Sequence, residues 1–101
     1  MNLAIDVGNS LAKVALFDAD QIIETLRTEE LSVEFLAEIF RRNKRIDKAV
    51  MSAVREVPVD VEAYLSRKVK QFLNVDYRTR IPLRNRYQSP HTLVLTALRQ
   101  P

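Results

Sequence analysis

The sequence contains no cysteine, one glycine and one histidine among its 101 residues. Without cysteine, neither a disulfide framework nor a thiolate metal site can form. No apolar run approaches the roughly twenty residues that a membrane-spanning helix needs. The N-terminus also lacks the basic segment and apolar run of a signal peptide. We therefore expect a cytoplasmic protein that does not associate with membranes.

Charge of one sign does not dominate the composition, since the net charge is +3 with 47% hydrophobic and 29% charged residues. These proportions argue against disorder, and the length allows one domain of ordinary size. Positive charge is nevertheless enriched over residues 67–86, where Asp76 is the only acidic residue. This segment lacks the interleaved aromatic residues of a single-strand binder. We interpret it as a solvated face with anion contacts rather than as a nucleic-acid site.

Residues 2–17 predict a strand, a tight turn and a second strand. Residues 3–5 are apolar, residues 12–17 are again apolar and β-prone apart from Lys13, and turn-forming residues lie between them. Gly8 is the only glycine in the chain. We therefore expect it at a position where the turn tolerates no side chain.

The residue types around this turn indicate phosphate chemistry. Asp6 follows a buried strand, where a carboxylate can hold Mg²⁺ directly or through water. Gly8 lets backbone N–H groups approach an anion closely. Asn9 and Ser10 add short hydrogen-bonding groups, and Lys13 adds a cation. The residues alone leave a second interpretation open, an ordinary β-hairpin whose polar side chains only cap the turn.

The next segment predicts an antiparallel meander and then a helix. Residues 21–26 are expected to form a third strand with Ile23 on the core side. The strands of this region should pair antiparallel, because the connections are too short for crossovers. Ser32 is a suitable N-cap for a helix. The apolar face of this helix is formed at helical spacing by Phe35, Leu36, Ile39 and Phe40.

The following segment predicts a strand, a helix and a short strand. Residues 47–54 are expected to pair parallel to the first strand through a right-handed crossover, with Ser52 near the end where α/β sheets place ligand loops. A second helix is expected over about residues 60–72 with Asn74 ending it, followed by a brief strand at 75–77. The predicted fold class is α/β, with a mixed five-stranded sheet in the order β-β-β-α-β-α-β.

The N-terminal stretch MNLAIDVGNSLAKVALF resembles the first motif of type III pantothenate kinases, which belong to the actin-like ATPase superfamily of sugar and acetate kinases. Asp6, Gly8, Asn9 and Lys13 match the family's Asp-x-Gly-Asn-Thr turn and the cation after it, and Ser10 keeps the hydroxyl of the Thr. The resemblance implies that residues 6–13 form a phosphate loop for ATP and that Asp6 binds the metal. It also implies a ribonuclease-H-like half-domain, which we assign to residues 1–78.

A second segment, YQSPHTL at residues 87–93, resembles the Tyr-x-x-Pro-x-Thr-Leu segment of the same family. The resemblance implies that Tyr87 lines the pantothenate site. In the family, Gly-x-Asp-Arg follows directly, and its Asp is the general base. Here Leu93 is followed by Val-Leu-Thr-Ala, so we assign no catalytic residue. Residues 79–101 are interpreted as a basic loop and a truncated substrate-binding segment.

This departure leads to the hypothesis of a truncated or frameshifted N-terminal fragment, since a single-base deletion near codon 94 would account for it. The resemblance implies ATP-dependent phosphorylation of the primary hydroxyl of pantothenate, the first step of coenzyme A biosynthesis. It also implies Mg²⁺, a monovalent cation (K⁺ or NH₄⁺) and a homodimer. An alternative of a different class is a non-catalytic half-domain that binds only phosphate or a protein partner. A nucleic-acid-binding module that uses residues 78–86 is a third, weaker interpretation.

Overall fold

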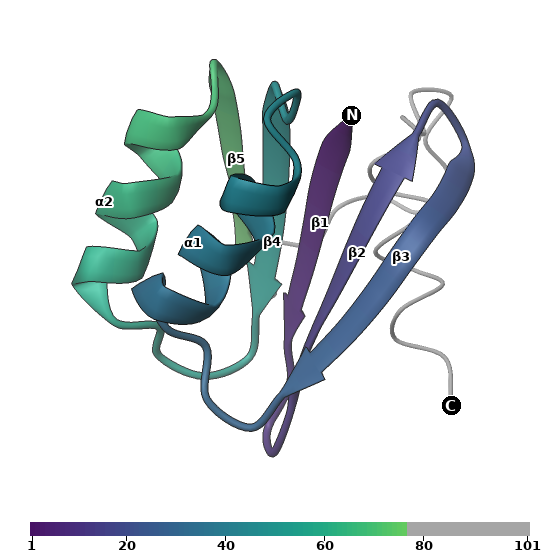
Figure 1. The fold of residues 1–101 in the computed structure, drawn as a ribbon. Helices are drawn as coiled ribbons and strands as arrows, with labels where there is room; N and C mark the ends of the chain where they lie inside the picture. The colour runs from purple at the N-terminus through teal and green to yellow at the C-terminus, as the bar shows by residue number, and fades with distance from the viewer. Residues whose placement is uncertain (77–101) are drawn as a thin grey trace.

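The computed structural model describes residues 1–76, which form one mixed sheet of five strands with two helices on one of its faces (Figure 1). The elements follow the order β1 (Asn2–Val7), β2 (Ala12–Asp18), β3 (Gln21–Thr28), α1 (Val33–Arg42), β4 (Lys48–Ala53), α2 (Val59–Lys68) and β5 (Gln71–Asp76). This β-β-β-α-β-α-β order confirms the prediction and is consistent with a half-domain of the actin-like ATPase fold. In the described segment, no helix is long and apolar enough to cross a membrane.

The spatial order of the strands is β3-β2-β1-β4-β5. The first three strands pair antiparallel as consecutive hairpins, because their connections are short. After α1, β4 returns to pair parallel with β1, and after α2, β5 pairs parallel with β4. The three parallel strands therefore end at the same edge of the sheet, which is where α/β folds place their ligand crevices.

Helix α1 begins as the sequence predicts. The Ser32 hydroxyl oxygen accepts a hydrogen bond of 3.2 Å from the backbone N–H of Phe35, which satisfies one otherwise unpaired donor of the first turn. Arg41 and Arg42 lie in the last turn, where cations complement the helix dipole. The helix buries Leu36, Ile39 and Phe40 against the sheet.

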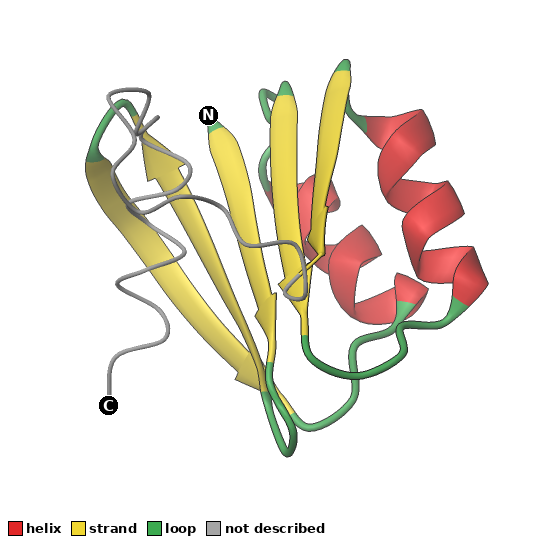
Figure 2. Ribbon diagram, turned by 180° about the vertical axis from the view of Figure 1, so that it is seen from behind, coloured by secondary structure: helices red, strands yellow, loops and turns green. Residues whose placement is uncertain are grey.

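The two faces of the sheet differ in how they are covered. Both helices lie on one face, where they bury the larger core cluster with Leu3, Ile5, Val14 and Met51 of the sheet (Figure 2). The opposite face carries a smaller buried cluster of Ala4, Ala15, Phe17 and Val50. Successive residues of a strand point to opposite faces, so β1 contributes residues to both clusters.

The structure corrects the predicted end of the second helix. Helix α2 ends at Lys68, and Val69 already has extended backbone angles, φ −116° and ψ 156°. Phe72 and Asn74, expected in or just after the helix, lie inside β5, which is longer than the predicted strand. The apolar spacing of α2 extends past its end, but pairing of residues 71–76 with β4 outweighs helix propensity.

A second correction concerns Ile23, which was expected on the core side and is 55% exposed. The register between β2 and β3 shifts at this point, because Leu16 pairs with Glu24 while Phe17 pairs with Ile22. Ile23 is the extra residue of this β-bulge. A bulge cannot be recognised from the alternation of residues along one strand. The prediction for Ile23 was wrong because it assumed an unbroken alternation.

Candidate functional site

The turn between β1 and β2 is closed by its only glycine. The Gly8 backbone N–H donates a 2.9 Å hydrogen bond to the carbonyl oxygen of Leu11. A Cβ atom at position 8 would lie 3.1 Å from that same oxygen, so a side chain would require the turn to widen by a few tenths of an ångström. No glycine among the described residues has a positive φ. Gly8 therefore serves the close approach of two backbone segments, and its own N–H is used inside the turn.

Three polar side chains lie side by side on the three central strands, β2, β1 and β4, close to the carboxyl ends of β1 and β4. Asp6 on β1 is the register partner of Lys13 on β2 and, on its other side, of Ser52 on β4. Register partners on neighbouring strands point to the same face of a sheet. We call Lys13, Asp6 and Ser52 the polar row. It lies on the face opposite the helices, because Ala4 and Val50, two residues earlier on β1 and β4, belong to the smaller apolar cluster there.

The polar row is largely withdrawn from solvent. Asp6 is 8% exposed, Ser52 is 0% exposed and Lys13 is half-buried. Burial of a carboxylate costs free energy unless a cation, a metal or hydrogen-bond donors compensate its charge. The neighbouring strand places Lys13, a cation, directly opposite Asp6. An arrangement of this kind is suited to hold a charged ligand between fixed groups of both signs.

The predicted loop residues lie at the end of the sheet next to the polar row. Asn9 and Ser10 are exposed in the β1–β2 turn, directly after the carboxyl end of β1. The backbone N–H of Val54 donates a 2.9 Å hydrogen bond to the carbonyl oxygen of Val7, which holds the exit from β4 beside this turn. The structure thus collects Asp6, Gly8, Asn9, Ser10 and Lys13 with Ser52 at one edge of the sheet. Proximity of these residues is the observation; their binding role stays a prediction.

Asp6 is the carboxylate of the polar row that could bind a metal ion. Within residues 1–76, no group of three or more His, Cys, Asp or Glu side chains is placed to hold a metal ion. Mg²⁺, however, keeps several waters and is usually held by one or two carboxylates together with substrate phosphates. The single carboxylate of Asp6 beside a cation fits a magnesium–phosphate ligand of that kind.

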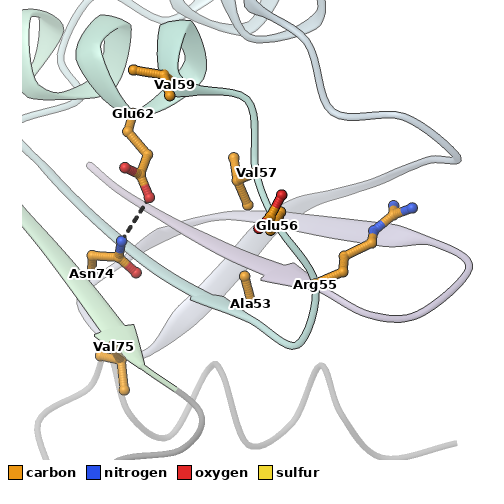
Figure 3. A pocket seen from close by; sticks show the side chains of 8 residues that line it. All are labelled: Ala53, Arg55, Glu56, Val57, Val59, Glu62, Asn74 and Val75. Atoms are coloured by element: carbon orange, nitrogen blue, oxygen red, sulfur yellow. Dashed lines mark hydrogen bonds between the residues drawn. The ribbon is translucent and has the colours of Figure 1, made fainter.

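A cavity of about 530 Å³ opens beyond the ends of β4 and β5 (Figure 3). On one side of it, the Asn74 side-chain amide donates a 2.8 Å hydrogen bond to the Glu62 carboxylate. On the other side, Arg55 donates a 2.9 Å hydrogen bond to the backbone carbonyl of Glu29. Val75, the register partner of Ser52, and Ala53, the residue after it, also line this cavity. Val59 and Glu62 of α2 line the cavity as well, so it lies on the helix side of the sheet, whereas the polar row faces the other side.

The structure places Asp6 and Lys13, two of the predicted site residues, side by side, and it adds Ser52, which the sequence did not connect to Asp6. The sequence showed Ser52 only as a polar residue near the end of a strand. The predicted parallel pairing of β1 with β4 could have revealed this pair. If the last residues of the two strands, Val7 and Ala53, are aligned, the residues before them, Asp6 and Ser52, are also partners. Tyr87, His91 and the position after Leu93 lie outside the described residues, as does the basic segment from Arg78 onward.

Comparison with known proteins gives a consistent result. A family model described as "Type III pantothenate kinase" matches residues 2–93. The chain is similar to proteins of that name from Bacteroides fragilis strain YCH46, with 34% identity over 93 residues, and from Phocaeicola vulgatus, with 30% identity over 98 residues. These matches cover 92% and 97% of the chain but only 38% and 40% of the relatives. A Christiangramia forsetii protein of the same name is 32% identical over 96 residues.

Proposed function

The chain belongs to the type III pantothenate kinase family, and we propose that it is the N-terminal, phosphate-binding part of such a kinase. The observation that carries this proposal is the polar row at the carboxyl ends of β1 and β4, which combines a buried carboxylate with a neighbouring cation. The proposal includes ATP as the phosphoryl donor, pantothenate as the acceptor and a location in the cytoplasm. It assigns residues 1–78 to the half-domain and residues 79–101 to the basic loop and substrate-binding segment.

Each residue of the site has a distinct role in this proposal. Lys13 attracts the phosphate groups, and the exposed Asn9 and Ser10 donate hydrogen bonds to them from the turn. Asp6 holds Mg²⁺, which would neutralise charge on the phosphates. Gly8 keeps the turn closed, so that the neighbouring donors stay in place. Tyr87 contacts pantothenate, while the monovalent cation and the homodimer stay predictions from the family resemblance.

The reaction would break the bond between the terminal phosphorus and its bridging oxygen and form a bond to the pantothenate hydroxyl oxygen, while the hydroxyl proton passes to a base. No residue of this chain is assigned as that base, because the family's Asp does not follow Leu93. This absence favours a second candidate, a half-domain that binds phosphate or a protein partner without catalysis. The two candidates share the phosphate site and differ in turnover.

The binding site is tested by measuring the affinity of the purified 101-residue chain for ATP with Mg²⁺ by calorimetry. We expect Lys13→Ala and Asp6→Asn each to weaken binding about tenfold or more, because each removes a charge-assisted contact. Matched controls are Lys44→Ala and Asp20→Asn, which alter an exposed lysine and an exposed aspartate outside the site. Equal effects of site and control variants would refute the phosphate site.

The two candidates are separated by phosphorylation of pantothenate. Turnover by the chain that Asp6→Asn abolishes would support the kinase and refute the non-catalytic candidate. Binding of ATP without turnover, together with turnover once Gly-x-Asp-Arg and the remaining length of a relative are joined after Leu93, would identify the chain as a non-catalytic part of a kinase. Failure of the joined chain as well would count against the kinase assignment.

A further inference from the structure

A second cavity, of about 440 Å³, is lined by residues of both helices and of the segment that follows α1. We call it the interhelix cavity. Helices α1 and α2 lie side by side on one face of the sheet (Figure 1), so this cavity lies on the helix side, away from the polar row. Its volume is within the range of about 300–1,000 Å³ that is typical of small-molecule sites.

The charges around the interhelix cavity have one sign. Arg41, Lys44 and Lys68 line it, whereas none of its described lining residues carries a carboxylate. The charge of Arg41 is matched by Glu38, whose carboxylate oxygen lies 2.6 Å from the guanidinium nitrogen. Within residues 1–76, neither Lys44 nor Lys68 forms an ion pair. Two ammonium groups at one cavity attract an anion.

Two aromatic rings hold one of these ammonium groups in place. The rings of Phe40 and Tyr64 pack edge to face, with their centroids 5.9 Å apart and an interplanar angle of 78°. The Nζ atom of Lys68 lies 5.9 Å from the Phe40 centroid and 5.8 Å from the Tyr64 centroid. Attraction to the ring faces favours this position but leaves the positive charge in place. A lysine that is already positioned loses less side-chain entropy when an anion binds.

Helix ends alone account for part of this arrangement. Arg41 and Lys68 lie in the last turns of α1 and α2, where cations complement the helix dipole without any ligand. The dipole does not account for the apolar wall of the cavity, which is formed by Ala37, Ile46 and the two rings. These apolar residues are buried or half-buried, whereas both lysines are exposed. A matching ligand therefore has an apolar group for the wall and a negative charge for the rim.

We propose that the interhelix cavity binds a small organic anion, with its apolar group against Ile46 and Tyr64 and its phosphate or carboxylate at Lys44 and Lys68. This proposal goes beyond the proposed function and does not depend on it. The two sites lie on opposite faces of the sheet, so each can be altered without the other.

The test is a nuclear magnetic resonance titration of the isotope-labelled 101-residue chain with three probes. Phenyl phosphate combines an apolar ring with a negative charge, inorganic phosphate has only the charge, and benzyl alcohol has only the ring. We expect phenyl phosphate to shift the backbone amide signals of residues 37–46 and 64–68. It should bind at least about fivefold more tightly than either of the other probes, because only phenyl phosphate uses both the wall and the rim.

Three variants examine the two parts of the cavity separately. Lys68→Met keeps the length of the side chain and removes its charge, so we expect about three- to fivefold weaker binding of phenyl phosphate. Lys68→Arg keeps the charge and should retain binding. Ala37→Leu fills the cavity without changing any charge and should weaken binding by at least as much as Lys68→Met. Lys70→Met is the matched control, because Lys70 is exposed and does not line the cavity.

Equal affinity for phenyl phosphate and inorganic phosphate would overturn the proposal, because charge alone would then explain binding. Unchanged binding in Lys68→Met and Ala37→Leu would overturn it too. A lower thermal midpoint of Lys68→Met without weaker binding would show that this lysine serves only the end of α2.

Lys13→Ala separates this proposal from the proposed function. It should weaken binding of ATP and leave binding of phenyl phosphate unchanged, while Lys68→Met should do the reverse. If Lys13→Ala abolishes binding of phenyl phosphate, the probe occupies the polar row, and the interhelix proposal fails while the proposed function stands. If Lys13→Ala leaves ATP binding intact and Lys68→Met still weakens binding of phenyl phosphate, the proposed function fails and the interhelix proposal stands.

Discussion

The two faces of this sheet are built from the same strands but under different constraints. On the helix face, apolar side chains of β1, β2 and β4 meet α1 and α2, and burial explains the choice of each residue. On the opposite face, the apolar residues Ala4, Ala15 and Val50 give way to Lys13, Asp6 and Ser52 one step closer to the carboxyl edge. Hydrophobic burial does not explain that change. Residues on the helix face are thus accounted for by folding, whereas the polar row is accounted for by the ligand-binding role that we propose.

The largest effect is expected from Leu36→Ala on the helix face. Leu36 is 0% exposed in α1, and truncation of a fully buried leucine removes apolar contacts and leaves a cavity. We expect the free energy of unfolding to fall by about 2–5 kcal/mol, measured by urea denaturation. For the fraction that remains folded, ATP affinity should not change. Glu34→Ala, an exposed position of the same helix, is the control, and an equal loss of stability there would contradict the prediction.

On the opposite face, Asp6→Asn is expected to affect ATP affinity more than stability. The amide has nearly the same shape as the carboxylate, so packing is conserved while the charge is removed. We expect the free energy of unfolding to change by less than about 1 kcal/mol, while the Mg²⁺-dependent part of ATP affinity falls by at least about tenfold. Unfolding and calorimetry on the same sample measure both quantities. A loss of stability as large as that of Leu36→Ala would show that Asp6 has a structural role instead.

The sequence predicted the helix face better than the polar row, for a physical reason. Apolar periodicity and the Ser32 cap are local signals, and they located α1 correctly. The parallel pairing of β4 with β1 followed from the crossover rule. The proximity of Asp6 and Ser52 depends on register, which no local pattern encodes. The end of α2 was predicted too late for the same reason, because the pairing of β5 with β4 determines where the helix stops.

An intermediate effect is expected from Gly8→Ala, which should change both the stability of the fold and the affinity for ATP. The new Cβ would approach the Leu11 carbonyl oxygen at 3.1 Å, so the turn must widen by a few tenths of an ångström. We expect a loss of about 1 kcal/mol in the free energy of unfolding, within the usual range for a single substitution. ATP affinity should fall as well, because Asn9 and Ser10 are displaced with the turn. Unchanged ATP affinity in a destabilised variant would separate the turn from the ligand.

The smallest effect is expected from Glu38→Gln, on the solvent side of the helix layer. The Glu38 carboxylate lies 2.6 Å from Arg41, yet both side chains are more than half exposed, so water and salt screen the pair. The hydrogen bond from Arg41 lowers the pKa of Glu38 below its ordinary value of 4.5. The folded state therefore binds fewer protons than the unfolded state in that range. The contribution of the pair is complete above 4.5 and is lost as the pH falls through the lowered pKa.

The thermal midpoints of the wild type and Glu38→Gln should accordingly differ slightly at neutral pH and low salt. The difference should vanish well below pH 4.5 or in high salt. A difference that persists in acid would mean that packing of the side chain, and not its charge, is responsible. The Glu38–Arg41 pair is exposed, so its short distance contributes little to stability. The carboxylate and the hydroxyl of the polar row, in contrast, are largely excluded from solvent. Burial, more than distance, therefore distinguishes an incidental charge contact from a candidate site in this protein.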